Sequence, residues 1–411
     1  MDLYQTISLL FTVAVAVAYL NYRFIKMPSS ISIMFASLLI SVAFTLLGKI
    51  GAINFDDWLE TALRSINFHA LLMNGMLGYL LFAAALNIDI SELHSKRREI
   101  FLLATLGTVF SALIVGFSCY LLFSFLGYHL ALIYCLLFGA LISPTDPIAV
   151  LSILKKVGAP QSIRIYLEGE SLFNDGVGIV LFVVLYQVLT AGKEVSFGFA
   201  TAVFFHQVLG GIVYGVLLGF VTNRLLRRVQ SHNIILLLTL AVASGGYTLA
   251  ELFEFSGPLA MVVSGIMIGN ESNRGLMTQE NSTYLKEIWE VIDEVLNALL
   301  FVLIGFEILV VQMQLTLFLG SLLVVVLVLI ARACSVVLPL KYFAKPENAY
   351  PNLYKILIWG GLRGGLAVAL ALSLPEGKAR EAILSLTYFT VAFSILVQGM
   401  TIKSLLKKTM S

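Results

Sequence analysis

Long apolar blocks, each about the length of a membrane span, are the feature of this sequence that most limits its fold. The first block runs from Leu3 to Leu20 and the last from Ala382 to Leu405. A helix needs about 20 apolar residues to cross the hydrocarbon core of a bilayer. Charged residues make up only 12% of the chain, whereas a soluble globular domain carries about 25%. The sequence therefore predicts an all-α membrane protein and not a soluble protein with a very large core.

The apolar blocks divide into thirteen predicted spans joined by short connections. A stretch at 49–68 is predicted to be an amphipathic segment at the membrane interface, and the connections leave no room for a soluble domain. The chain is thus predicted to be a single integral-membrane unit over residues 1–411. The predicted spans are 3–22, 29–48, 69–88, 100–126, 129–154, 162–191, 198–225, 232–253, 256–270, 285–311, 315–342, 352–374 and 382–404.

Positive charge predicts the orientation of these spans. Most of the 26 lysines and arginines lie in the connections after odd-numbered spans or at the C-terminal end. Cytoplasmic loops of membrane proteins are enriched in Lys and Arg. The N-terminus is therefore predicted to lie outside and the C-terminus in the cytoplasm of a plasma or inner membrane.

Composition also excludes several classes of function. The three cysteines (Cys119, Cys135 and Cys334) stand singly within apolar blocks, so they form neither a metal-binding spacing nor a disulfide framework. No basic run is long enough to bind nucleic acid. Neither an enzyme motif nor a cofactor-binding motif is present, and the Gly-Glu-Ser-Leu-Phe run at 169–173 lacks the Gly-x-Ser-x-Gly spacing of a nucleophile elbow.

The first candidate site is Ser-Pro-Thr-Asp-Pro at 143–147, inside the fifth predicted span. Each of the two prolines removes an amide donor and clashes with the preceding turn, so the helix must break there. Backbone opened within a bilayer needs partners from protein, water or an ion, and Thr145 and Asp146 can supply some of them. Broken helices of this kind form the ion sites of secondary transporters. A proline kink capped locally by Asp146 is the alternative.

The second candidate is Glu-Gly-Glu-Ser-Leu-Phe-Asn-Asp-Gly at 168–176, near the middle of the sixth predicted span. A charged residue at membrane depth is costly and is a functional candidate by default. Ser171 and Asp175 are four residues apart and share one helical face, and Glu170 and Asn174 share the neighbouring face. Hydroxyl and carboxylate oxygens are hard ligands that suit a dehydrated cation. A permanently paired, structural Asp175 is the alternative.

The third candidate is Trp-Gly-Gly-Leu-Arg-Gly-Gly at 359–365, in the twelfth span. Four glycines around one arginine favour unwinding and close backbone approach. Arg363 needs a buried anion, for which Glu170 is the best candidate; a headgroup contact is the alternative. The interrupted fifth and twelfth spans are each the middle of a three-span group. Because seven spans separate them, the two groups are inverted in the membrane, as in transporters with inverted repeats.

Four acids open the tenth predicted span. They could form a wetted surface or line an access funnel that concentrates cations. No role is assigned to Arg332, the other mid-span arginine. The four acids are Glu287, Glu290, Asp293 and Glu294.

The three motifs at 143–147, 170–175 and 359–364 together resemble those of NhaP/NHE-type sodium/proton antiporters, and the resemblance covers essentially the whole chain. It implies a homodimer in the membrane lipid, with dimerisation helices from 1–90 and 230–311 and a linker helix at 198–228. It also implies a mobile core from 100–192 and 315–405 that moves like an elevator. The implied activity is exchange of Na⁺ for H⁺.

The resemblance also implies roles for single residues. Asp175 would bind both the cation and the proton, Ser171 and the Thr145 backbone would add oxygens to the Na⁺ site, and Asp146 would lie next to the ion. Asn174 resembles the residue of electroneutral one-for-one exchangers, in which an electrogenic branch has a second aspartate. Glu170 with Arg363 would be a structural ion pair of the core.

One position departs from the family pattern. Many relatives carry an acid in the third span where this chain has Ala83, so the resemblance does not specify the full set of ligands or the cation preference. A K⁺/H⁺ or mixed Na⁺/K⁺/Li⁺ exchanger stays open, because similar oxygens serve all three cations. A cation channel, an intramembrane aspartyl protease using Asp146 and Asp175, and an organic-anion transporter are the more distant alternatives.

Overall fold

The computed structural model describes residues 3–49, 68–191, 197–270, 278–307, 315–344 and 352–410. All the regular structure within these ranges is helical. The predicted interfacial segment at 49–68 lies almost entirely outside the described residues.

Helices of very different lengths make up the first half of the fold. Three π-helical turns continue or join some of them, at Asn21–Ile25, Leu71–Met76 and Leu103–Gly107. The helices are α1 (Leu3–Leu20), α2 (Ser29–Lys49), α4 (Phe68–Ala70), α5 (Leu77–Leu86), α6 (Ile90–Ser95), α7 (Arg97–Leu102), α8 (Thr108–Phe125), α9 (Leu132–Ile142), α10 (Ile148–Lys156) and α11 (Gln161–Ala191).

The second half has the same character, with π-helical turns at Val242–Gly246, Pro339–Ala344 and Ser394–Gln398. Its helices are α12 (Phe197–Leu226), α13 (His232–Ala241), α14 (Tyr247–Leu252), α15 (Gly257–Gly269), α16 (Gln279–Glu307), α17 (Leu315–Leu338), α18 (Leu353–Gly360), α19 (Gly365–Leu372), α20 (Lys378–Phe393) and α21 (Gly399–Met410).

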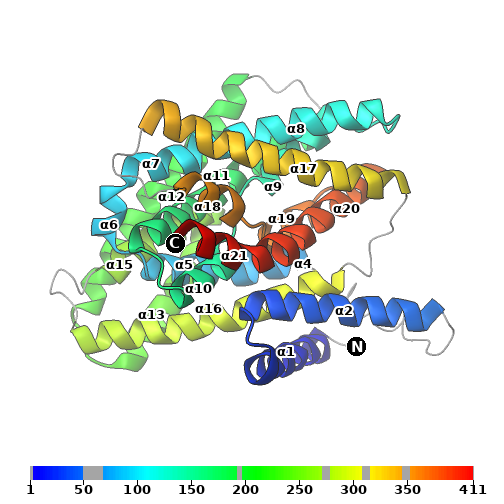
Figure 1. Cartoon of the computed structure of the whole chain (residues 1–411). Coiled ribbons are helices and arrows are strands. Elements are labelled where there is room, and N and C mark those ends of the chain that lie inside the picture. Colours follow the sequence, from blue (N-terminus) through cyan, green and yellow to red (C-terminus); the bar gives the residue numbers. More distant parts are fainter. Residues whose placement is uncertain are drawn as a thin grey trace.

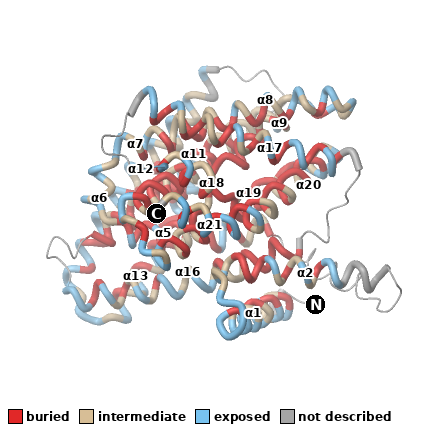
Figure 2. The backbone as a smooth tube through the Cα atoms, in the orientation of Figure 1, coloured by how far each residue is buried: buried red, intermediate tan, exposed pale blue. Residues whose placement is uncertain are grey.

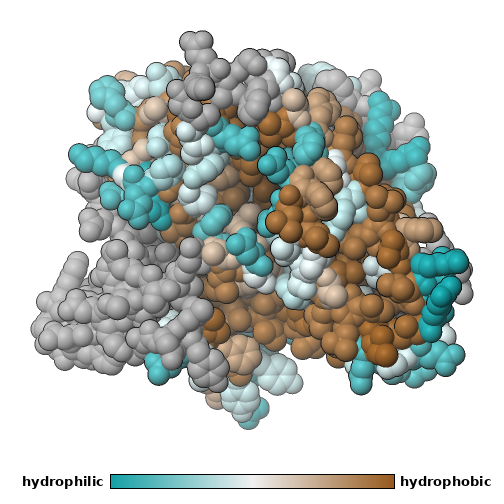
Figure 3. All heavy atoms as spheres, turned by 180° about the vertical axis from the view of Figure 1, so that it is seen from behind, coloured by the Kyte–Doolittle hydropathy of each residue, from teal (hydrophilic) through white to brown (hydrophobic). Residues whose placement is uncertain are grey.

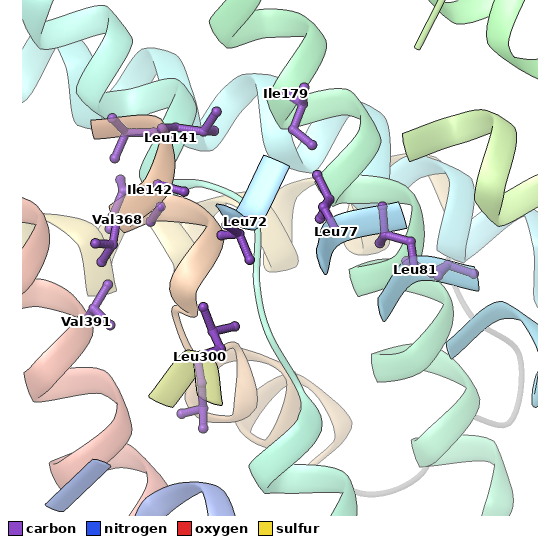
Figure 4. Packing of buried hydrophobic residues seen from close by; sticks show 14 of the residues in the cluster. Leu72, Leu77, Leu81, Leu141, Ile142, Ile179, Leu300, Val368 and Val391 are labelled. Carbon is purple, nitrogen blue, oxygen red and sulfur yellow. The ribbon is translucent and has the colours of Figure 1, made fainter. Parts of the chain in front are cut away.

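Short broken helices occupy the middle of the bundle and long helices surround them. In Figure 1, α8 and α17 pack together along one side, and α1, α2 and α16 pack together along the opposite side. Between them, α9 contacts α19 and α20. Leu141 and Ile142 of α9 lie close to Val368 of α19 and Val391 of α20 there (Figure 4).

The burial pattern is that of a protein that faces lipid. Buried residues concentrate in the centre of the bundle (Figure 2). Large apolar side chains are nevertheless exposed on the outer helices, among them Leu121 and Phe125 of α8 and Leu217 and Phe220 of α12. A broad hydrophobic area covers much of the face drawn in Figure 3. These side chains can be exposed to lipid tails without an energetic cost, whereas their exposure to water would be unfavourable.

Helix length and hydropathy give a smaller count of spans than the sequence did. Among the described residues, eight helical segments pass as single spans, and the bent pair α18–α19 makes a ninth. Three further apolar helices are too short (Ser29–Ala43, Leu132–Ile142 and Gly257–Gly269). Each of the thirteen predicted spans overlaps one of these helices or α16, whose acids lower its hydropathy. The all-helical, multi-span prediction is therefore confirmed, and the number thirteen stays a prediction.

Candidate functional site

The first predicted break is present between α9 and α10. Helix α9 ends at Ile142, and α10 begins at Ile148, after both prolines. The side chain of Asp146 satisfies the first amide of α10, because its Oδ1 accepts a hydrogen bond of 3.0 Å from the Ile148 N–H. The Pro-x-x-Pro spacing thus leaves non-helical backbone at 143–147 in the middle of the bundle, as expected from the missing amide donors.

The second predicted break, between α18 and α19, crosses the first. Helix α18 ends at Gly360 and α19 begins at Gly365, with a bend of 41° between them. The Asp146 amide donates a 2.8 Å hydrogen bond to the Leu362 carbonyl, which joins the two breaks directly. Gly364 permits this approach, since a Cβ atom there would lie 2.4 Å from Oδ2 of Asp146.

The side chain of Arg363 makes its hydrogen bonds to the backbone and not to an acid. Its guanidinium donates to the carbonyls of Ser143 and, at 2.9 Å, Pro144. Its own amide donates to Oγ of Ser394 at 2.9 Å. Those two carbonyls end helix α9, where the helix dipole places negative partial charge. The side chain is buried, so this cation replaces hydrogen bonds that the prolines remove.

The predicted pairing of Glu170 with Arg363 is wrong, because Glu170 pairs with Arg332. Arg332 of α17 binds both carboxylate oxygens, through Nη1 to Oε1 and through Nη2 to Oε2 at 2.9 Å. It also donates to the Leu357 carbonyl from Nε at 3.2 Å and from Nη2 at 2.8 Å. Both partners are almost fully buried, at 1% and 4% exposure. The pair therefore ties α11, α17 and α18 together, and it leaves Arg363 free to cap α9.

Asn174 is bound to the first break. Its Nδ2 donates to Oγ1 of Thr145 at 2.9 Å, and its Oδ1 accepts from the Thr145 amide at 3.4 Å. Both ends of the Asn174 amide are used in this way, and both residues are buried. The side chain of Asn174 thereby holds the Thr145 backbone in position, and its predicted contact with the ion stays a prediction. The Thr145 carbonyl accepts no hydrogen bond from the residues that the structure describes.

The side chain of Asp175 takes part in none of these hydrogen bonds and ion pairs. It lies in the middle of the continuous helix α11, next to Asp146, with which it interacts electrostatically. Ser171 lies one turn earlier on the same face. The side chains of Asp175 and Ser171 make no hydrogen bond or ion pair with any described residue. The Asp175 carboxylate and the Ser171 hydroxyl on one face of α11, and the carbonyl of Thr145, which is bonded to Asn174 of the same helix, therefore have unused acceptor capacity. Such oxygens can hold an alkali cation or, on the carboxylate, a proton.

Comparison with known proteins agrees with this arrangement. The sequence profile of the family described as "Sodium/hydrogen exchanger, transmembrane" matches residues 10–408. The chain belongs to the sodium/hydrogen exchanger family. It is 41% identical over 394 residues to the Na(+)/H(+) antiporter NhaP of Pseudomonas aeruginosa, covering 95% of this chain and 93% of that one. It is 32% identical over 413 residues to NhaH of Halobacillus dabanensis, covering 99% and 98%.

The fold agrees as well. The sodium proton antiporter MjNhaP1 from Methanocaldococcus jannaschii superposes with a TM-score of 0.80 over 100% of both chains, at 20% identity. Members of the sodium/hydrogen exchanger family are membrane transporters, so this multi-span protein is a transporter and not an enzyme. The resemblance seen in the three motifs is confirmed.

Two features of this exchanger-family site go beyond the sequence-based prediction. Arg332 was left without a role, although a charge inside an apolar helix already signals a buried partner. Ala83, at the position of the missing acid, is buried in α5 at 1% exposure. Helix α5, which carries this position, contacts both α11 and α16.

Proposed function

We propose that this chain exchanges Na⁺ for H⁺ across the cell membrane, with Asp175 as the shared binding group. The named relatives are Na(+)/H(+) antiporters, which supports the choice of ions. The single observation that carries the proposal is the Asp175 carboxylate, which is without a bonding partner among the described residues at the crossing of two broken helices.

Competition at one carboxylate is enough to couple the two ions. A carboxyl group taken out of water is favoured in its neutral form, and a bound cation favours the ionised form. A bare carboxylate is costly to carry through a barrier in the bilayer. The site therefore crosses loaded with either a proton or a cation, and exchange follows.

One-for-one exchange follows from the neighbours of Asp175. Asn174 is neutral and committed to Thr145, and Glu170 is neutralised by Arg332. We take Asp146, whose Oδ1 accepts a hydrogen bond from the Ile148 amide, to keep one charge state throughout the cycle. Asp175 is then the group whose charge changes, and either one Na⁺ or one H⁺ neutralises it. The cycle moves no net charge.

The links at the crossing support the proposed division into a core and a scaffold. The hydrogen bonds and ion pairs of Asp146, Arg332 and Arg363 all join residues within 100–192 and 315–405, the proposed mobile core. We propose that this core moves as one body against dimerisation helices from 1–90 and 230–311 of a homodimer, with 198–228 as the linker. The N-terminus is proposed to lie outside and the C-terminus in the cytoplasm.

A vesicle assay tests the proposal. Purified protein is reconstituted into sealed vesicles that enclose a buffer of known pH. Na⁺, Li⁺ or K⁺ is added outside, and the internal pH is measured with and without an imposed membrane potential. We expect Na⁺-dependent proton movement that does not respond to the potential. Asp175→Asn is expected to abolish it, because the amide cannot exchange a proton for a cation.

The matched control is Asn87→Asp, a change of the same two residue types at the exposed end of α5, which is expected to leave exchange intact. Exchange by Asp175→Asn at the wild-type rate would contradict the proposal. Exchange driven equally by K⁺ would identify the K⁺/H⁺ or mixed alternative, and current without proton movement would identify a channel. Ala83→Glu, run in parallel, shows whether the missing acid affects the cation preference.

A further inference from the structure

One face of α16 leads directly to the crossing. Trp289 packs on Phe82 of α5, with ring centroids 4.8 Å apart, and donates to Oγ1 of Thr239 at 3.0 Å. Leu300, three turns further along α16, packs against the start of α19, and a Cβ atom on Gly365 would lie 2.5 Å from its Cδ1. Figure 4 shows Leu300 below the helix that carries Val368.

Asp293 and Asn297 lie on this face between Trp289 and Leu300, because steps of four and three residues keep side chains in one row. Asp293 is half-buried. Its carboxylate interacts electrostatically with Asp146, across from α16 to the first break. Asp146 in turn interacts with Asp175. Three carboxylates therefore follow one another from α16 to the proposed exchange site.

Asn297 gives independent reason to place a ligand here. It is 4% exposed, and its Oδ1 makes no hydrogen bond with the part of the chain that the structure describes. Its amide lies beside the Asp293 carboxylate. Buried side-chain polar atoms in folded proteins nearly always have a partner. A buried amide oxygen without one, next to a carboxylate, has the chemistry of a cation ligand.

We propose that Asp293 and Asn297 form a second binding subsite for the alkali cation, between the Gln279 end of α16 and the exchange site at Asp175. A monovalent cation there relieves the repulsion between Asp293 and Asp146 and satisfies the Asn297 oxygen. The subsite holds the cation before Asp146 and Asp175 receive it. This inference rests on the proposed function, since it assumes that Asp175 takes up the cation.

The test measures the KM for Na⁺ separately on the two faces, in inside-out and right-side-out vesicles. Asp293→Asn is expected to raise the KM by about three- to tenfold from the face of the Gln279 end, as loss of one partly screened charge does. From the opposite face the KM is expected to stay unchanged. Asn297→Asp, which adds a carboxylate to the subsite, is expected to lower the KM from the first face.

Glu294→Gln is the matched control, since it removes an exposed acid one residue away. An equal rise in KM for Glu294→Gln and Asp293→Asn would assign the effect to surface charge and overturn the subsite. Wild-type KM values for both Asp293→Asn and Asn297→Asp would also overturn it, while leaving the proposed function in place. Absence of exchange by the wild-type protein would overturn both.

Discussion

The two buried arginines near the crossing bind different kinds of partner. Arg332 binds Glu170 through two nitrogens, and Arg363 binds the carbonyls at the end of α9. The planar, forked guanidinium suits both tasks, and a lysine would satisfy neither. The two arginines are thus not interchangeable, and the pair with Glu170 belongs to Arg332 alone.

Arg332→Gln is expected to destabilise the protein by about 3–5 kcal/mol, because it leaves the Glu170 carboxylate buried and without its partner. The double variant Glu170→Gln/Arg332→Gln removes both charges and is expected to recover part of that loss. Thermal unfolding in detergent, followed for the wild type, both single variants and the double variant, measures the coupling. Strictly additive losses would show that the two side chains do not stabilise each other.

The sequence predicted residues that the structure brings together at the crossing of the two breaks, but not all of their partners. Charge inside an apolar span marked Asp146, Glu170, Asp175 and Arg363, because such charge is costly anywhere else in the bilayer. The choice between two arginines for Glu170 depends on how α11, α17 and α18 pack, and Arg332 lies 162 residues away along the chain. The residues next to Glu170 in the sequence do not show which of the two arginines packs against it in the fold.

At the scale of elements, the paired breaks of α9–α10 and α18–α19 depend on one tight contact. The hydrogen bond from the Asp146 amide to Leu362 brings Gly364 against the Asp146 carboxylate. The prolines and glycines predicted both breaks, because each of these residues weakens a helix by a known mechanism. That the two breaks meet is shown by the structure, through the hydrogen bond between Asp146 and Leu362.

Gly364→Ala is expected to reduce exchange severely, because the added Cβ atom would lie 2.4 Å from Oδ2 of Asp146 and would force the two breaks apart. The measurement is the vesicle exchange rate, with the yield of folded protein checked by gel filtration. Gly245→Ala is the control, since a Cβ atom there meets no described atom within 4 Å. An unchanged rate for Gly364→Ala would show that the contact is dispensable.

At the scale of the whole molecule, α16 connects the proposed scaffold with the proposed core. It packs on α1, α2 and α5 and also touches α19 beside the crossing (Figure 1). Its acids make it less apolar than the outer helices α8 and α17. An acidic helix at this boundary is consistent with a path by which water and cations reach the site.

The central claim is that Na⁺ and H⁺ compete for Asp175, and proton release on Na⁺ binding tests it most directly. Calorimetric titration of the purified protein with Na⁺, in buffers of different ionisation enthalpy, counts the protons released at each pH. We expect one proton per Na⁺ at low pH, falling toward none as the pH rises and the carboxyl group ionises beforehand, and no release from Asp175→Asn. Na⁺ binding without proton release at any pH, or equal release from Asp175→Asn, would contradict the account.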